Sequence, residues 1–140
     1  MGRLRKFLHL PAAERRLLLA AVWLLALVRV ALWAMPFRQL YGRVQARARP
    51  GARPTMPAER VIWAVTAADR FVPRSTCLVR ALAGQILLAR CGHASELRLG
   101  VAGGGAAFEA HAWLEHDGRV LLGGPVEGRY TPLPSLHGRP

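Results

Sequence analysis

The sequence is poor in cysteine and almost free of lysine. Its two cysteines, Cys77 and Cys91, are too few for a disulfide framework, and they form no C-x-x-C pair. Two reduced cysteines are typical of a cytoplasmic protein, which leaves at least one thiol free to react. Lys6 is the only lysine, so arginine carries nearly all of the formal net charge of +12.

This arginine excess is not by itself a sign of nucleic-acid binding, because GC-rich codon usage produces the same bias. The basic residues are spread along the chain, and no zinc-knuckle, helix-turn-helix or RNP pattern is present. We therefore expect no nucleic-acid partner. The basic balance still favours an anionic partner, such as a membrane surface or an acidic peptide.

Length and composition indicate one folded domain with an appended segment. At 140 residues the chain is long enough to bury about two-thirds of its unfolded surface. Hydrophobic residues make up 52% of it, which excludes intrinsic disorder.

The first 43 residues are predicted to form a hydrophobic helical segment. Within residues 17–35 the apolar run is interrupted only by Arg29, and Pro36 ends or kinks the helix. A membrane span needs about twenty mostly apolar residues, so this stretch qualifies only if Arg29 is tolerated near one end. Its arginines gather on one side of the helical wheel, which favours a helix packed against the domain or a partner. Membrane contact, either lying on or spanning the bilayer, is the alternative.

Residues 44–58 are rich in arginine, proline and glycine and have no hydrophobic period, so they are predicted to be an exposed linker. Pro57 is suited to the first turn of a helix that runs to about Ala68. A folded domain is expected over residues 59–140.

Cys77 is expected in the first turn of an apolar helix. Leucine and alanine recur at helical spacing after it, Ser75 and Thr76 are candidate N-caps, and Gly92 is a candidate stop. Unpaired amides and the helix dipole there favour the nucleophilic thiolate. The alternative is a buried structural cysteine, which is the interpretation that fits Cys91 at the opposite end of the helix.

His111 is expected in the middle of a strand. Residues 95–101 and 108–116 alternate in polarity, and Asp117-Gly118 predicts a hairpin to a further strand at 119–122. His111 would share one face with Glu109, Trp113 and Glu115. A lone strand histidine is commonly a surface or packed residue. A metal site fails on spacing, because His116 would point to the other face.

A cysteine at a helix start followed by histidine-Ala-Trp on a later strand is the order found in transglutaminase-like cysteine proteases. The strings STCLVRALAGQILLARCG, LRLGV and FEAHAWLEHDGRVLLGG also resemble the leader-peptidase B proteins of lasso-peptide biosynthesis, over roughly residues 60–124. The resemblance implies that Cys77 is the nucleophile and His111 the general base and acid. It also implies three partners: a precursor peptide, a separate leader-binding protein, since no winged-helix module is present, and an asparagine-synthetase-like cyclase.

The third catalytic group departs from the family pattern. The resemblance places an acid near residues 122–124, where this chain has Leu-Gly-Gly. A regular hairpin sets Leu122 opposite Trp113 and Gly124 opposite His111. Asp117 is then too distant along the strand, and Glu109 and Glu127 are the acids within reach. A backbone carbonyl or a water is the remaining alternative.

Together these observations predict an α+β fold with a papain/transglutaminase-like core, in which a cysteine-bearing helix packs on a small antiparallel sheet. The expected activity is leader removal from a ribosomal precursor by a cysteine protease, with no cofactor and no metal. Acyl transfer to an amine by the same pair and an inactive membrane-associated scaffold are the rival functions. We expect a cytoplasmic protein, in contact with the membrane if residues 17–35 bind lipid.

Overall fold

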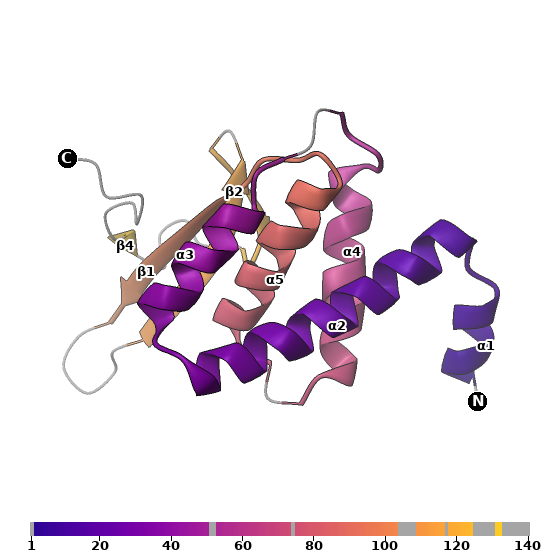
Figure 1. The fold of residues 1–140 in the computed structure, drawn as a ribbon, viewed down its shortest axis with the longest axis horizontal. Coiled ribbons are helices and arrows are strands. Elements are labelled where there is room, and N and C mark those ends of the chain that lie inside the picture. Colours follow the sequence, from indigo (N-terminus) through magenta and orange to yellow (C-terminus); the bar gives the residue numbers. More distant parts are fainter. Residues whose placement is uncertain are drawn as a thin grey trace.

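The computed structural model describes residues 2–50, 53–73, 75–103, 109–116, 118–124 and 131–132. Five α-helices precede the strands (Figure 1). The helices are α1 Gly2–Leu8, α2 Ala12–Ala34, α3 Phe37–Arg47, α4 Ala58–Ala68 and α5 Cys77–Arg90, with a 3-10 turn, η1, at Asp69–Phe71. The strands are β1 Glu96–Ala102, β2 Glu109–His116, β3 Arg119–Leu122 and β4 Thr131–Pro132.

The strands form one antiparallel sheet in the order β3-β2-β1-β4. Strands β1 and β2 pair along their length, from Glu96 opposite Glu115 to Ala102 opposite Glu109. The helices lie together beside this sheet (Figure 1), so the predicted α+β architecture is confirmed.

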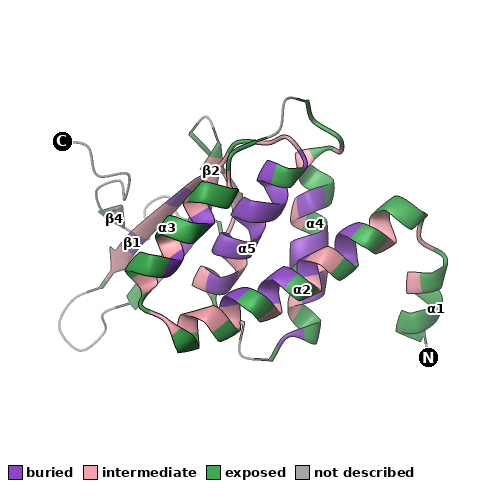
Figure 2. Ribbon diagram, in the orientation of Figure 1, coloured by how far each residue is buried: buried purple, intermediate pink, exposed green. Residues whose placement is uncertain are grey.

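The core is built around α5, which is buried along most of its length (Figure 2). One side of α5 meets the sheet at Gly84, where a Cβ would lie 3.1 Å from the Leu114 and Leu122 side chains. The absence of a side chain at this position lets β2 and β3 approach the helix closely. Helices α2 and α4 pack on other sides of α5, and their buried residues belong to the same hydrophobic cluster.

Helix α2 is divided lengthwise into two faces. One face is buried in the core, whereas the other is exposed (Figure 2). Helix α2 is long and apolar enough to cross a membrane, a test that core helices of soluble proteins and signal sequences also pass. As predicted, the helix ends before Pro36.

The structure differs from the predicted linker at its beginning. Residues 44–47 belong to α3, and Val44 is buried, because this turn of α3 packs against α5. Gln45 and Gln85 exchange two side-chain hydrogen bonds, of 2.9 and 3.2 Å. Helix α3 also lies near the sheet: burial raises the pKa of Tyr41, and the Glu96 carboxylate acts in the same direction.

The end of the predicted linker is fixed to the C-terminal end of α5. Gly92, at a φ of 88°, completes the helix end, where its amide donates to Ala89 and the His93 amide to Leu88. A Cβ at Gly92 would collide with the Arg53 carbonyl, so glycine is needed for both conformation and space. The His93 ring contacts the Met56 carbonyl at 2.5 Å.

The register between β2 and β3 corrects the regular hairpin. His116 pairs with Arg119 as predicted, but a bulge follows, and Leu122 lies opposite Leu114 instead of Trp113. The expected pairing of Gly124 with His111 was tied to the same regular register, which the bulge interrupts. The extra residue turns Leu122 to the face of Leu114, where both side chains pack near Gly84 of α5.

Replacing Gln85 should loosen the attachment of α3. Gln85 is 2% exposed, and its amide also donates to the Ser95 carbonyl. Gln85→Leu keeps the size of the side chain but leaves the Gln45 amide and the Ser95 carbonyl without their hydrogen-bond partner. We therefore expect the free energy of unfolding to fall by about 1–2 kcal/mol. Urea unfolding followed by circular dichroism measures the change. Gln39→Leu, at an exposed position of α3, is the control, and an equal loss in both variants would contradict the assignment.

Candidate active site

Cys77 is the first residue of α5. The Thr76 hydroxyl caps the helix by accepting a 3.3 Å hydrogen bond from the Val79 amide, and the Thr76 carbonyl accepts the first helical bond from Arg80. The amides of Cys77 and Leu78 lie outside the helix's own hydrogen-bond ladder. Cys77, which is partly buried, therefore lies at the positive end of the helix dipole.

Cys91 has a different environment. It is the buried C-cap of the same helix, with 9% of its surface exposed, and its carbonyl accepts from the Thr55 amide. Both cysteines are free thiols. Cys91 contributes to the hydrophobic core, so the two cysteines differ as the sequence predicts.

His111 lies in β2 opposite Gly100 of β1. Its ring stacks on Trp113, with centroids 6.0 Å apart, and Trp113 Nε1 donates to Glu115 at 2.5 Å. These contacts confirm that the three side chains share one face. Alternation puts the Leu114 side chain on the other face, which packs on α5.

The imidazole of His111 is held by a backbone carbonyl. Its Nε2 lies 2.6 Å from the oxygen of Gly123. Because a carbonyl oxygen only accepts, Nε2 carries the proton in this contact, and the neutral ring keeps its lone pair on Nδ1. The carbonyl thus fixes the tautomer and orientation of the ring.

Gly123 adopts a backbone conformation that favours glycine. Its φ is 94°, and a Cβ would lie 2.9 Å from the Trp113 Cβ and 3.0 Å from the Ala112 oxygen. Any other residue would have to shift the backbone, and the carbonyl with it.

Cys77 and His111 line the same two cavities. The first, of about 190 Å³, is completed mainly by Arg80, Leu122 and the Gly123-Gly124 backbone. The second, of about 180 Å³, is completed by apolar groups of α5 and the sheet, namely Leu78, Leu99, Val101 and Ala110. The larger cavity of about 330 Å³ between α4 and β3 contains neither residue.

No hydrogen bond joins the Cys77 sulfur to the imidazole among the contacts of the described residues. In unliganded enzymes such contacts are often long and tighten only when substrate binds. Cys77, from the start of α5, and His111, from β2, are thus both wall residues of the same cavities, and the His111 ring lies with Trp113 on the sheet face opposite Leu114.

Of the acids considered for orienting His111, Glu109 alone lies within the described residues. Glu109 is exposed at the start of β2, two positions before His111 and opposite Ala102. Glu127 and Asp117 lie outside the described residues. The group observed on the ring is the Gly123 carbonyl, one of the alternatives that the sequence left open.

Arg80 is a cavity residue that sequence reasoning did not single out. It follows Cys77 by three positions, so both lie on one face of α5, and it forms a 3.5 Å ion pair with Asp69 of η1. The three-residue spacing between Cys77 and Arg80 was the sequence feature that could have identified it. Within the described part of the chain, no group of three or more His, Cys, Asp or Glu side chains is arranged to hold a metal ion.

Comparison with known protein families matches residues 21–135 to the transglutaminase-like superfamily. No curated protein and no solved structure gives a significant match. The family match covers most of the chain, including the second half of α2, all of α3 and both cavity-lining residues Cys77 and His111. Superfamily membership indicates chemistry of the cysteine peptidase or acyltransferase type. The chain therefore belongs to the transglutaminase-like superfamily.

Proposed function

We propose that the protein is a cysteine protease that removes the leader from a ribosomally made precursor peptide. Cys77 is the nucleophile, and His111 is the general base and acid. The observation that carries this proposal is that Cys77, at the start of α5, and His111, in β2, line the same two cavities.

The reaction begins with transfer of the Cys77 proton to Nδ1 of His111. The thiolate adds to the carbonyl carbon of the scissile amide, and the imidazolium then protonates the leaving nitrogen as the C–N bond breaks. A water, deprotonated by His111, hydrolyses the thioester and restores the thiol. The amides of Cys77 and Leu78 are suited to stabilise the oxyanion, because the helix leaves both without an internal partner.

The leader-peptidase assignment is supported by the resemblance of residues 60–124 to lasso-peptide B proteins. On this proposal the chain acts in the cytoplasm with a separate leader-binding protein and hands the freed amine to an asparagine-synthetase-like cyclase.

Loss of the Cys77 thiol should abolish cleavage. We expect Cys77→Ala to lower the rate by at least about a thousandfold, because the covalent step is lost, whereas Cys91→Ala keeps most of it. The assay follows leader release by mass spectrometry, using a lasso-peptide precursor together with its leader-binding protein. The opposite ranking of the two variants would overturn the site.

The same assay separates the rival functions. Repeated with an added primary amine, it yields the free acid if water is the acceptor and an amide adduct if the protein is an acyltransferase. Cleavage that is indifferent to Cys77→Ala would instead identify an inactive scaffold and a contaminating protease.

Alkylation tests the thiols without any substrate. Iodoacetamide should modify Cys77 at least about tenfold faster than Cys91, because Cys77 lines two cavities and Cys91 is buried. Peptide mapping after timed quenching gives both rates in one sample. Equal rates would remove the distinction between a reactive thiol and a core thiol.

Gly123→Ala tests the carbonyl that holds His111. The new Cβ would displace the backbone, and misplacing the imidazole should lower kcat by about a hundredfold with little change in KM. Gly118→Ala is a matched control, because Gly118 has a similar φ of 76° but nothing within 4 Å of its Cβ position. Equal losses in both variants, or full activity of Gly123→Ala, would rule out a positioning role for this carbonyl.

A further inference from the structure

The exposed face of α2 carries an unbroken apolar stripe. Its five large side chains recur at intervals of three and four residues and therefore share one face. They are Leu19, Trp23, Leu27, Val30 and Trp33. With Ala34 the stripe extends for about 22 Å at roughly 1.5 Å per residue. Trp23 and Trp33 are 66% and 87% exposed, which is far more than packing inside a domain would leave.

The opposite face of α2 belongs to the core. Leu17, Leu18, Ala21, Leu24, Leu25 and Val28 are buried against the rest of the fold. A helix that spans a bilayer must meet lipid or other membrane-embedded protein on all sides. Here α2 is tied to α4 and α5, and α4 carries exposed charged residues such as Glu59 and Arg60. Helix α2 is therefore placed to lie on a membrane and not to cross it.

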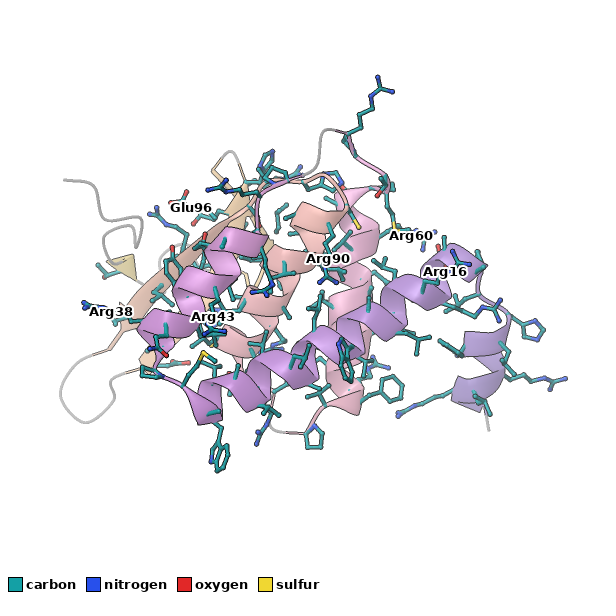
Figure 3. All side chains as sticks on the ribbon, in the orientation of Figure 1. Arg16, Arg38, Arg43, Arg60, Arg90 and Glu96 are labelled. Carbon is teal, nitrogen blue, oxygen red and sulfur yellow. The ribbon has the colours of Figure 1, made fainter. Side chains whose placement is uncertain are left out.

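Most basic residues of the N-terminal helices precede the stripe. Residues 2–34 contain six basic side chains (Arg3, Arg5, Lys6, Arg15, Arg16 and Arg29) and one acid, Glu14, which is paired with Arg60 at 3.2 Å. Arg16 is exposed one turn before Leu19 (Figure 3). An amphipathic helix with exposed tryptophan and flanking arginine has the composition of an interfacial membrane helix.

A groove of about 260 Å³ adjoins the stripe at Leu27, between α2, α3 and α5. Its floor is apolar, with Leu24, Val28 and Ile86 among its residues, and its rim carries Arg43, Arg47 and Arg90. Figure 3 shows Arg43 and Arg90 coming from α3 and α5 beside α2. These three exposed arginines form no ion pair among the described residues. Guanidinium groups beside apolar surface suit the phosphates of anionic lipids, whose acyl chains lie next to them.

We propose that α2 docks the protein on an anionic membrane surface, with Trp23 and Trp33 inserted at the level of the headgroups and Arg43, Arg47 and Arg90 contacting lipid phosphate. The inference goes beyond the proposed protease activity and does not depend on it. Cys77→Ala should bind vesicles as the wild type does, so failure of one proposal leaves the other standing.

Vesicle flotation with the full chain tests the proposal. We expect binding to phosphatidylcholine vesicles that contain phosphatidylglycerol, weak binding to phosphatidylcholine alone, and a blue shift of tryptophan fluorescence on binding. Replacing Trp23 and Trp33 together by serine should weaken binding roughly a hundredfold. Trp63→Ser is the control, because Trp63 is exposed on α4. Unchanged circular dichroism shows that each variant is folded.

Further variants and conditions distinguish docking on a lipid surface from a spanning helix and from contact with a second copy of the chain. Changing Arg43, Arg47 and Arg90 to glutamine should remove the preference for anionic vesicles, and high salt or alkaline carbonate should release the wild type. Resistance to carbonate would overturn the proposal in favour of a spanning helix. A failure to float with anionic vesicles, together with a dimer in sedimentation that the tryptophan double variant loses, would assign the stripe to a second copy of the chain. A failure to float without such a dimer would also overturn the proposal.

Discussion

The packing of α5 between the sheet and the N-terminal helices sets the position of every group in the candidate site. Its first residue is the thiol, and its glycine at position 84 lets Leu114 and Leu122 lie close against it. That contact selects the bulged register of β2 and β3, and the bulge precedes the turn at Gly123 whose carbonyl holds His111. The nucleophile and the orientation of its base thus depend on one hydrophobic interface.

Local chemistry made much of this arrangement predictable from the sequence. Thr76, Gly92, Pro36 and Pro57 mark the ends of their helices through interactions with immediate neighbours in the chain. Alternation along β2 correctly placed His111, Trp113 and Glu115 on one face. The positions of Cys77 and His111 in a helix start and a strand followed from these local rules.

The features that sequence reasoning missed depend on distant contacts. Helix α3 extends to Arg47 because Val44 and Gln45 find partners on α5, and no periodicity within residues 44–58 reveals those partners. The bulge arises because Leu122 packs near Gly84 of α5, thirty-eight positions earlier in the chain. The sequence pattern of the two paired strands contains no sign of that contact. A carbonyl acting on His111 leaves no signature in side-chain identity, so a search for an acid at residues 122–124 could not find it.

The reciprocal amide pair of Gln45 and Gln85 has a consequence for where the protein can work. Amides neither gain nor lose a proton across the biological range, so this junction between α3 and α5 is indifferent to acidity and only weakly sensitive to ions. Ion pairs such as Arg60 with Glu14 are, by contrast, weakened by salt and by protonation of the carboxylate. Close to a negatively charged interface, where protons and counterions accumulate, the uncharged junction would hold the two helices together under conditions that weaken charged contacts.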